Sequence, residues 1–133
     1  MNADLMRGHR ILVVEDSIIL GRFFRDVLES AGAEIVGPAA TLDDARALAA
    51  ENRLSAALLD VLLNGKEVWP AAQVLAKKGV PFAFCTGHVD RSSIPQEWSH
   101  RPILIKPAPP QQIIYAVFNL LNQFDDELAE GAS

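Results

Sequence analysis

The sequence predicts an α/β domain built on a parallel β-sheet whose two faces are covered by helices. Short apolar runs of strand length alternate with longer segments in which apolar residues recur at helical spacing, which is typical of βαβ units. The connections in such units are right-handed, and this places helices on both faces of the sheet. The five runs that we expect to be strands lie at residues 10–15, 35–36, 55–60, 82–86 and 102–106.

The helical segments between these runs carry start and stop signals. The first helix is expected to end at Gly32, because glycine adopts the backbone conformation that commonly closes a helix. Thr41 is expected to be the N-cap of the second helix, with Asp43 and Asp44 in its first turn, where negative charge is favourable. Pro70 is compatible with the third helix because it falls in the first turn.

The remaining segments set the expected limits of the domain. Glycine, serine and proline interrupt residues 87–101, so that a fourth helix should be short or irregular. A final helix is expected after Pro110. We expect one domain over residues 9–124, with flexible termini at 1–8 and 125–133.

Composition excludes several classes of protein. At 133 residues, with 50% hydrophobic and 22% charged residues, the chain has the composition of a globular domain. Its net charge of -5 and the lack of a basic stripe argue against nucleic-acid binding. We find neither an apolar run of about 18 residues, as a membrane span requires, nor a signal peptide. Cys85 lies inside an apolar run, so we expect a buried, reduced thiol and a cytoplasmic protein.

Four of the expected strands end on polar residues of particular kinds. The first is followed by Glu15 and Asp16, the third ends on Asp60, the fourth on Thr86 and the fifth on Lys106. Ligands of open parallel sheets bind outside the carboxyl ends of the strands, so we expect these side chains to meet in one crevice. Such a set can hold a divalent cation beside an aspartate that accepts a phosphoryl group.

The chain resembles the receiver domain of bacterial two-component response regulators. The resemblance lies in the order of the residues at the strand ends, with Pro107 following Lys106. The resemblance implies a flavodoxin-like fold, a doubly wound five-stranded parallel sheet with strand order 2-1-3-4-5. Residues 81–87 read Pro-Phe-Ala-Phe-Cys-Thr-Gly and are similar to a Pro-Phe-x-Phe-x-Thr-Gly signature. Together with residues 59–65, they resemble a stand-alone subgroup of receivers from alphaproteobacteria.

The resemblance assigns the acidic residues to a metal and a phosphoryl group. Asp60 is the implied phosphoryl acceptor, and Mg²⁺ is the implied cofactor. Its implied ligands are Glu15, Asp16, Asp60 and the backbone carbonyl of Leu62, which suits the preference of Mg²⁺ for oxygen. Without metal, three clustered carboxylates repel one another, so that at least one of them should have a raised pKa.

The other implied roles concern phosphoryl binding and switching. Lys106 and Thr86 are expected to bind the phosphoryl group, and Thr86 to move as a switch. A cis peptide bond is expected before Pro107. Leu62 and His88 stand at positions that tune dephosphorylation in the family.

The chain departs from the usual receiver pattern in two places. Ile103 stands where receivers usually carry an aromatic residue, and Leu63 with Asn64 where many carry a proline. We therefore expect switching through ordering of the loop after the fourth strand rather than through a rotating ring. Trp69 and Trp98 are expected to be packing residues, with a partner contact at Trp98 as the alternative.

These observations favour a single-domain response regulator in two-component or phosphorelay signalling. Its expected partners are a sensor histidine kinase or histidine phosphotransfer protein and a downstream protein target, with the chain a monomer or weak dimer. We expect a phosphoacceptor that assists its own phosphorylation and dephosphorylation, and not a turnover enzyme. One alternative is a receiver-fold binding module that acts without phosphorylation. Another is a haloacid-dehalogenase-like hydrolase, but Leu62 replaces the second aspartate that such enzymes carry.

Overall fold

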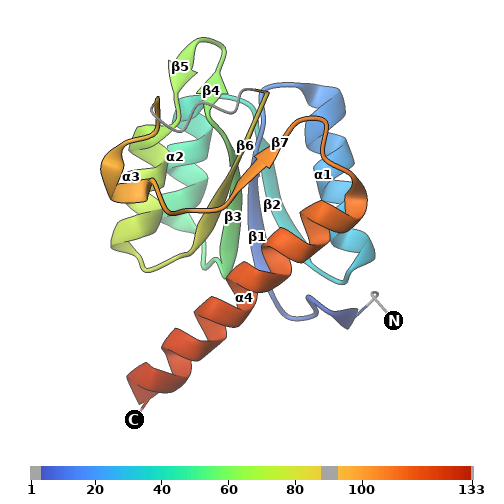
Figure 1. Ribbon diagram of the computed structural model, residues 1–133, viewed down its shortest axis with the longest axis vertical. Helices are drawn as coiled ribbons and strands as arrows, with labels where there is room; N and C mark the ends of the chain where they lie inside the picture. The colour runs from blue at the N-terminus through green and yellow to red at the C-terminus, as the bar shows by residue number, and fades with distance from the viewer. Residues whose placement is uncertain (1–3, 88–92, 133) are drawn as a thin grey trace.

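A five-stranded parallel sheet forms the centre of the molecule, with the order β2-β1-β3-β6-β7 (Figure 1). The structure is a computed structural model that describes residues 4–87 and 93–132, with side chains described up to Gln123. The strands of the central sheet are β1 (Arg10–Val14), β2 (Glu34–Ala39), β3 (Ala56–Asp60), β6 (Phe82–Thr86) and β7 (Ile103–Ile105). Counted along the chain within this sheet, the order is 2-1-3-4-5, which confirms the predicted flavodoxin-like fold.

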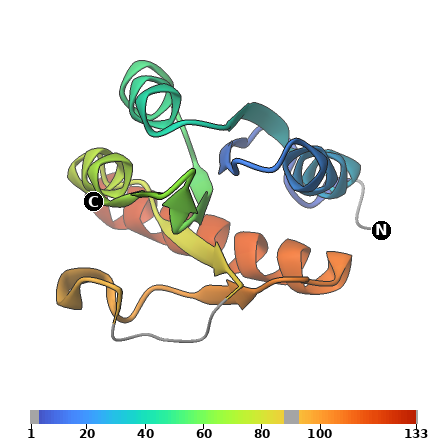
Figure 2. The same ribbon diagram turned by 90° about the horizontal axis from the view of Figure 1, so that it is seen from above.

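Helices cover the sheet on both faces. They are α1 (Ile18–Ser30), α2 (Leu42–Glu51), α3 (Trp69–Lys77) and α4 (Pro110–Ala132). One apolar core joins the sheet to α1 and α4, and a second joins it to α2 and α3 (Figure 2). Successive residues of a strand point to opposite faces, so Ile11 and Val13 enter the first core while Leu12 and Val14 enter the second.

The N-caps of α1 and α2 have the same arrangement. Ser17 caps α1, and its side chain accepts a hydrogen bond from the backbone N–H of Leu20. Thr41 caps α2, and its hydroxyl oxygen accepts a hydrogen bond from the N–H of Asp44 at 3.1 Å. The predicted cap of α2 is confirmed, with Asp43 and Asp44 in the first turn.

Thr41→Ala is expected to lower the free energy of unfolding by about 1 kcal/mol, because one helix N–H loses its acceptor. Thr41 is exposed, so little packing is lost with the side chain. Urea denaturation measures the effect, and Thr41→Ser, which keeps the hydroxyl, is the control. Equal unfolding midpoints for the alanine variant and the wild type would contradict the role of the cap.

A small hairpin lies between β3 and α3. Its antiparallel strands are β4 (Leu62–Leu63) and β5 (Lys66–Glu67). Asn64 and Gly65 connect them with φ angles of 51° and 85°, and two-residue hairpin turns with positive φ at both positions favour this pair of residues. Leu63 is 1% exposed, so it fixes the hairpin to the core on the α2 and α3 side.

The connection from β6 to β7 contains no α-helix within its described part, residues 93–102. It includes a short turn of 3₁₀-helix, η3 (Gln96–Trp98), in agreement with the predicted short fourth helix. Trp98 is 6% exposed and packs against Trp69, so the packing prediction is confirmed. Cys85 in β6 is buried, also as predicted, and burial raises the pKa of its thiol to about 12.

Three boundaries differ from those expected. β2 continues through Pro38 to Ala39, because it is an edge strand and such strands tolerate proline. α4 continues to Ala132, past residue 124, where we expected the domain to end. Met6 is fully buried, and its N–H donates a hydrogen bond to the carbonyl of Ala31 at 2.8 Å. The flexibility expected of the termini stays a prediction.

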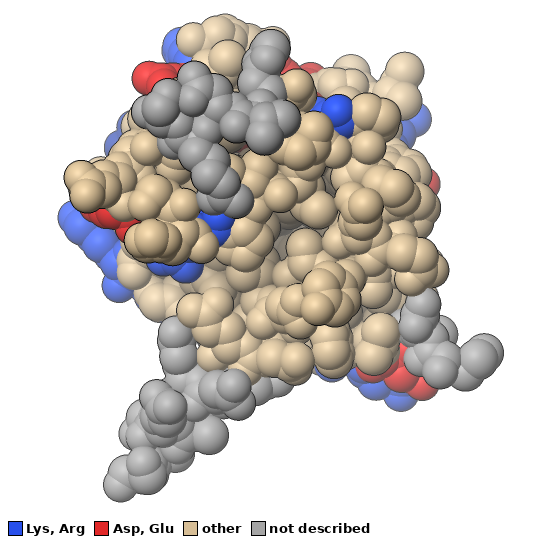
Figure 3. All heavy atoms as spheres, viewed as in Figure 1, with Lys and Arg blue, Asp and Glu red and all other residues tan. Residues whose placement is uncertain are grey.

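The face that carries α4 and β7 is mostly uncharged, with charged side chains toward its margins (Figure 3). The described residues on this face form no basic stripe of the kind used to bind nucleic acid. Among the described residues, no helix combines the length and apolar character needed to cross a bilayer.

Candidate functional site

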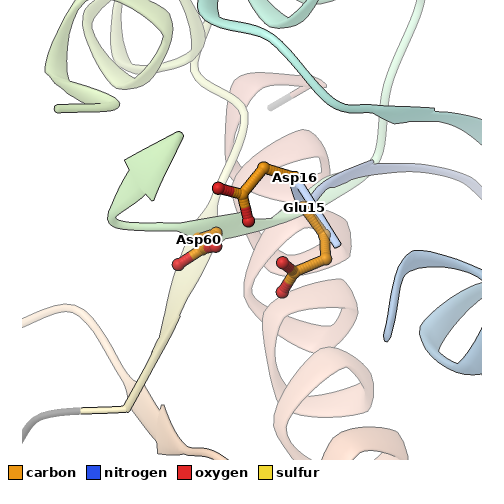
Figure 4. A group of neighbouring side chains, drawn as sticks. All are labelled: Glu15, Asp16 and Asp60. Atoms are coloured by element: carbon orange, nitrogen blue, oxygen red, sulfur yellow. The ribbon is translucent and has the colours of Figure 1, made fainter. Parts of the chain in front are cut away.

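Polar side chains gather at the carboxyl edge of the central sheet. Glu15 and Asp16 directly follow β1, and Asp60 is the last residue of β3. The three carboxylates can each offer one oxygen such that all three oxygens lie within 4.8 Å of one another (Figure 4). Residues 44 positions or more apart in the sequence thus come together because parallel strands end at the same edge.

Lys106 joins this group from the end of β7. Its Nζ lies 2.6 Å from Glu15 Oε1 and 3.1 Å from Asp60 Oδ2. The backbone N–H of Lys106 donates a hydrogen bond to the carbonyl of Thr86 at 2.8 Å, which extends the pairing of β6 and β7 up to the site. The structure therefore brings four of the predicted site residues into one group, in which Lys106 contacts Glu15 and Asp60 directly.

The carboxylates differ in burial and in hydrogen bonding. Glu15 is 1% exposed, and its Oε2 accepts a hydrogen bond from the N–H of Ser17 at 3.0 Å. Its Oε1 lies beside the Lys106 ammonium but accepts no aligned hydrogen bond from any described residue. Asp16 is half-buried, and its Oδ2 accepts a hydrogen bond from the N–H of Asn64 at 2.9 Å. This last bond ties the β4–β5 hairpin to the acidic group.

The environment shifts the pKa of Asp60 strongly. Burial and the nearby Glu15 carboxylate raise the pKa of Asp60 from 3.8 to about 7, although Lys106 acts in the opposite direction. This agrees with the expectation that crowding raises the pKa of at least one carboxyl group. Near neutral pH, without metal, Asp60 is therefore poised between its protonated and ionised forms.

Two neighbouring groups are held in their charged forms. Burial alone would raise the pKa of Asp16, but hydrogen bonds, first that from Asn64, bring it below its ordinary value. Burial alone would lower the pKa of Lys106, but its interactions with Glu15 and Asp60 raise it. The site thus combines a fixed cation with carboxylates of unequal basicity.

A cavity of about 320 Å³ opens beside Asp60. Among the residues that line it are Thr86 and Lys106, together with Ser93, Ile94 and Ile103. Room for an incoming group therefore exists next to the Asp60 carboxylate, on the side of the predicted switch residue.

For the remaining predicted site residues, the structure tests only some of the expectations. The peptide bond between Lys106 and Pro107 is cis, as expected. Leu62 begins β4 with its side chain 48% exposed, and the role of its carbonyl stays a prediction. His88 lies outside the described residues.

Sequence reasoning did not identify the residues that support the site. Ser17 and Asn64 orient Glu15 and Asp16, and Ser93 and Ile94 form one wall of the cavity. The Asn64-Gly65 pair is a known hairpin signal and could have indicated the hairpin. No local pattern indicates the cavity wall, because it depends on how residues 93–102 return to the sheet.

The donor set fits a small, hard divalent cation. All candidate ligand atoms are oxygens, one of them a buried carboxylate oxygen without an aligned donor, and Mg²⁺ prefers such ligands. Lys106 offsets part of the negative charge, leaving the group with excess negative charge for a metal to neutralise.

Comparisons with known proteins point to one class. No known family model matches the chain. A curated relative, the uncharacterized transcriptional regulatory protein YbdJ of Bacillus subtilis (strain 168), is 25% identical over 119 residues, which make up 87% of this chain and 52% of the relative. The chain thus spans about half the length of this relative.

Solved structures of response regulators superpose on the chain. The response regulator PhyR from Brucella abortus superposes with a TM-score of 0.77 and 25% identity, over 96% of this chain and 53% of that chain. A CheY-like response regulator receiver domain protein from Methanospirillum hungatei JF-1 superposes with a TM-score of 0.76 and 22% identity, over 92% of this chain and 98% of that chain. The structural neighbours are therefore response regulator receiver domains.

Proposed function

We propose that the chain is a response-regulator receiver in which Asp60 accepts a phosphoryl group from a phosphohistidine. Its donor would be a sensor histidine kinase or a histidine phosphotransfer protein, and its output a change in protein contacts. The observation that carries this proposal is the position of Lys106 Nζ between Glu15 and Asp60, beside a cavity at the sheet edge. A carboxylate acceptor and a fixed ammonium are the groups that phosphoryl transfer needs.

In the transfer, a carboxylate oxygen of Asp60 attacks phosphorus while the bond from phosphorus to the donor imidazole nitrogen breaks. The imidazole nitrogen takes up a proton, and nothing is oxidised or reduced. Glu15, Asp16, Asp60 and the Leu62 carbonyl would hold Mg²⁺, which when bound neutralises charge on the phosphoryl oxygens. Lys106 supplies a second positive charge, because its Nζ already lies 3.1 Å from Asp60 Oδ2.

Incubation with acetyl phosphate and Mg²⁺ tests the proposal. We expect the intact mass to rise by one phosphoryl group in the wild type and in Asp26→Asn, an exposed aspartate on α1. Asp60→Asn should show no gain, because an amide is not a phosphoryl acceptor. A gain of equal size in Asp60→Asn would overturn the assignment.

Addition of Mg²⁺ is expected to raise the thermal unfolding temperature, because the ion binds only the folded arrangement of carboxylates. At a free concentration about 100-fold above the dissociation constant, the gain is about 2.7 kcal/mol. Glu15→Gln and Asp16→Asn should lose most of this gain, whereas Asp44→Asn, outside the site on α2, should keep it. NaCl at matched ionic strength is the control, and equal stabilisation by NaCl and MgCl₂ would contradict a specific site.

We retain the finer expectations as parts of the proposal. These are the stand-alone alphaproteobacterial subgroup, a cytoplasmic location and a phosphoacceptor without enzymatic turnover. The competing binding module without phosphorylation is not favoured, because the acidic group and Lys106 lie together at the site.

A further inference from the structure

One described segment touches both the cavity beside Asp60 and the face of the molecule that carries α3. Residues 93–98 form this segment, which we call the linking segment. At one end, Ser93 and Ile94 line the cavity together with Asp60 and Thr86. At the other end, Trp98 lies in the core formed with α2 and α3.

Trp98 is the centre of an aromatic cluster between the linking segment, α3 and β6. Its ring centroid lies 6.0 Å from that of Trp69 on α3 and 6.0 Å from that of Phe82 on β6. Trp69 in turn meets Phe84 edge-on at 5.5 Å, and Phe84 pairs with Ile103 across β6 and β7. Aromatic pairs at such distances are attractive only in specific orientations, so a shift of one ring is felt by its neighbours.

The two ends of the linking segment are connected by a short, hydrogen-bonded piece of backbone. Ile94 and Trp98 are each 6% exposed. Between them, the N–H of Trp98 donates a hydrogen bond to the carbonyl of Pro95 at 2.9 Å, in the turn of η3. Because Pro95, the next residue after Ile94, is tied to Trp98 by this hydrogen bond, we expect a displacement of Ile94 to move Trp98.

A groove lies on the α3 side of the same segment. It has a volume of about 530 Å³, and Trp69, Pro70, Pro95 and Trp98 are among its lining residues. The shape of this groove thus depends on where the linking segment sits relative to α3.

We propose that the linking segment transmits the state of Asp60 to the α3 face, with Trp98 as the residue whose packing changes. The proposal rests on the phosphoacceptor function proposed for Asp60. A phosphoryl group adds oxygens that accept hydrogen bonds at the edge of the cavity, and Thr86 and Ser93, which both carry a hydroxyl, are among the residues that line it. The cavity gives the segment room to move toward Asp60, since closely packed interiors rarely hold such space. Movement in this direction changes the packing of Trp98 against Trp69, and with it the shape of the groove.

β7 carries no aromatic residue, so a rotating ring on that strand cannot transmit the state of Asp60. Ile103 lines the cavity, and no aromatic side chain is among its described lining residues. The aromatic residues near the site lie instead in the cluster around Trp98, which shares one apolar core with Ile94 and Ile103. The surface that changes is accordingly the groove along α3 and not the face of α4.

Fluorine NMR on the full chain, labelled with 5-fluorotryptophan and 3-fluorotyrosine, tests this inference. The chain has two tryptophans and one tyrosine, so the labels give three protein resonances. Trp69→Phe and Trp98→Phe assign the two tryptophans, and the wild type needs no substitution for the measurement itself. Tyr115, 68% exposed on α4 at the opposite face of the sheet, is the control probe. Beryllofluoride with Mg²⁺ mimics the phosphoryl group, and its own bound fluorine resonance reports occupancy of the site.

With beryllofluoride bound, we expect the Trp98 resonance to shift, that of Trp69 to follow, and that of Tyr115 to stay. In Asp60→Asn, all three should remain unchanged. Bound beryllofluoride without a shift of Trp98, or with a shift confined to Tyr115, would overturn the inference while leaving the phosphoacceptor function standing. Failure of both beryllofluoride binding and acetyl phosphate labelling would remove that function and the inference with it.

Discussion

Replacement of Lys106 by methionine is expected to lower the free energy of unfolding of the metal-free protein by about 3 kcal/mol near neutral pH. The ammonium lies within 3.1 Å of two carboxylates, and Glu15 is 1% exposed. Its removal leaves buried negative charges facing each other without compensation. Methionine keeps most of the apolar stem, so the loss is chiefly electrostatic.

The loss should depend on pH in a defined direction. Without Lys106, the pKa of Asp60 rises further, and its protonation relieves the repulsion as the pH falls. Urea unfolding in EDTA should therefore show a large deficit near about pH 7.5 that shrinks toward about pH 5. Lys66→Met, on the exposed strand β5, is the matched control. A deficit that stays constant over this range would contradict the electrostatic explanation.

Asp60→Asn is expected to act in the opposite direction and to stabilise the metal-free protein. The pKa of Asp60 is raised from 3.8 to about 7 in the folded state. Between these values the folded protein holds a proton that the unfolded chain has released, so stability falls as the pH rises. At 1.36 kcal/mol for each unit of pKa, the full cost near about pH 8 has an upper bound of about 4 kcal/mol. Asparagine has nearly the same shape and carries no charge, so it removes this cost.

Denaturation of both proteins in EDTA, from about pH 4 to about pH 8, measures the gain. The two stabilities should approach each other at the acidic end, where the unfolded chain also begins to take up the Asp60 proton, and separate by about 2–4 kcal/mol at the alkaline end. Mg²⁺ should then stabilise the wild type more than Asp60→Asn. If the free energies of unfolding of the two proteins coincide over the whole pH range, the Asp60 carboxylate does not destabilise the folded protein. An aspartate retained at a cost in stability is what a functional group is expected to show.

The part of the site that lies at strand ends could be predicted from sequence. Asp60, Thr86 and Lys106 each end or follow an apolar run, and parallel pairing alone brings such positions to one edge. No comparable rule covers the supporting groups. Asn64 reaches Asp16 through a hairpin whose strands are two residues each, too short for any periodicity to mark them.

For the fold too, some elements could be predicted from sequence patterns and others could not. Alternating apolar segments predicted the sheet and its helices, because burial of one face decides those elements. The second strand was expected only over residues 35–36, but it continues through Pro38, since an edge strand tolerates a residue that cannot donate a hydrogen bond. The burial of Met6 depends on contacts with the C-terminal end of α1, which is distant in the sequence. No pattern in the residues around Met6 predicts these contacts.

The buried thiol in β6 has a practical consequence for labelling. Cys85 is the chain's one cysteine, it is 1% exposed, and burial raises its pKa to about 12. Maleimides and related reagents attack the thiolate, so the folded protein resists them at neutral pH. Spin labels or fluorophores can therefore be attached to a cysteine introduced on the surface without first removing the native one.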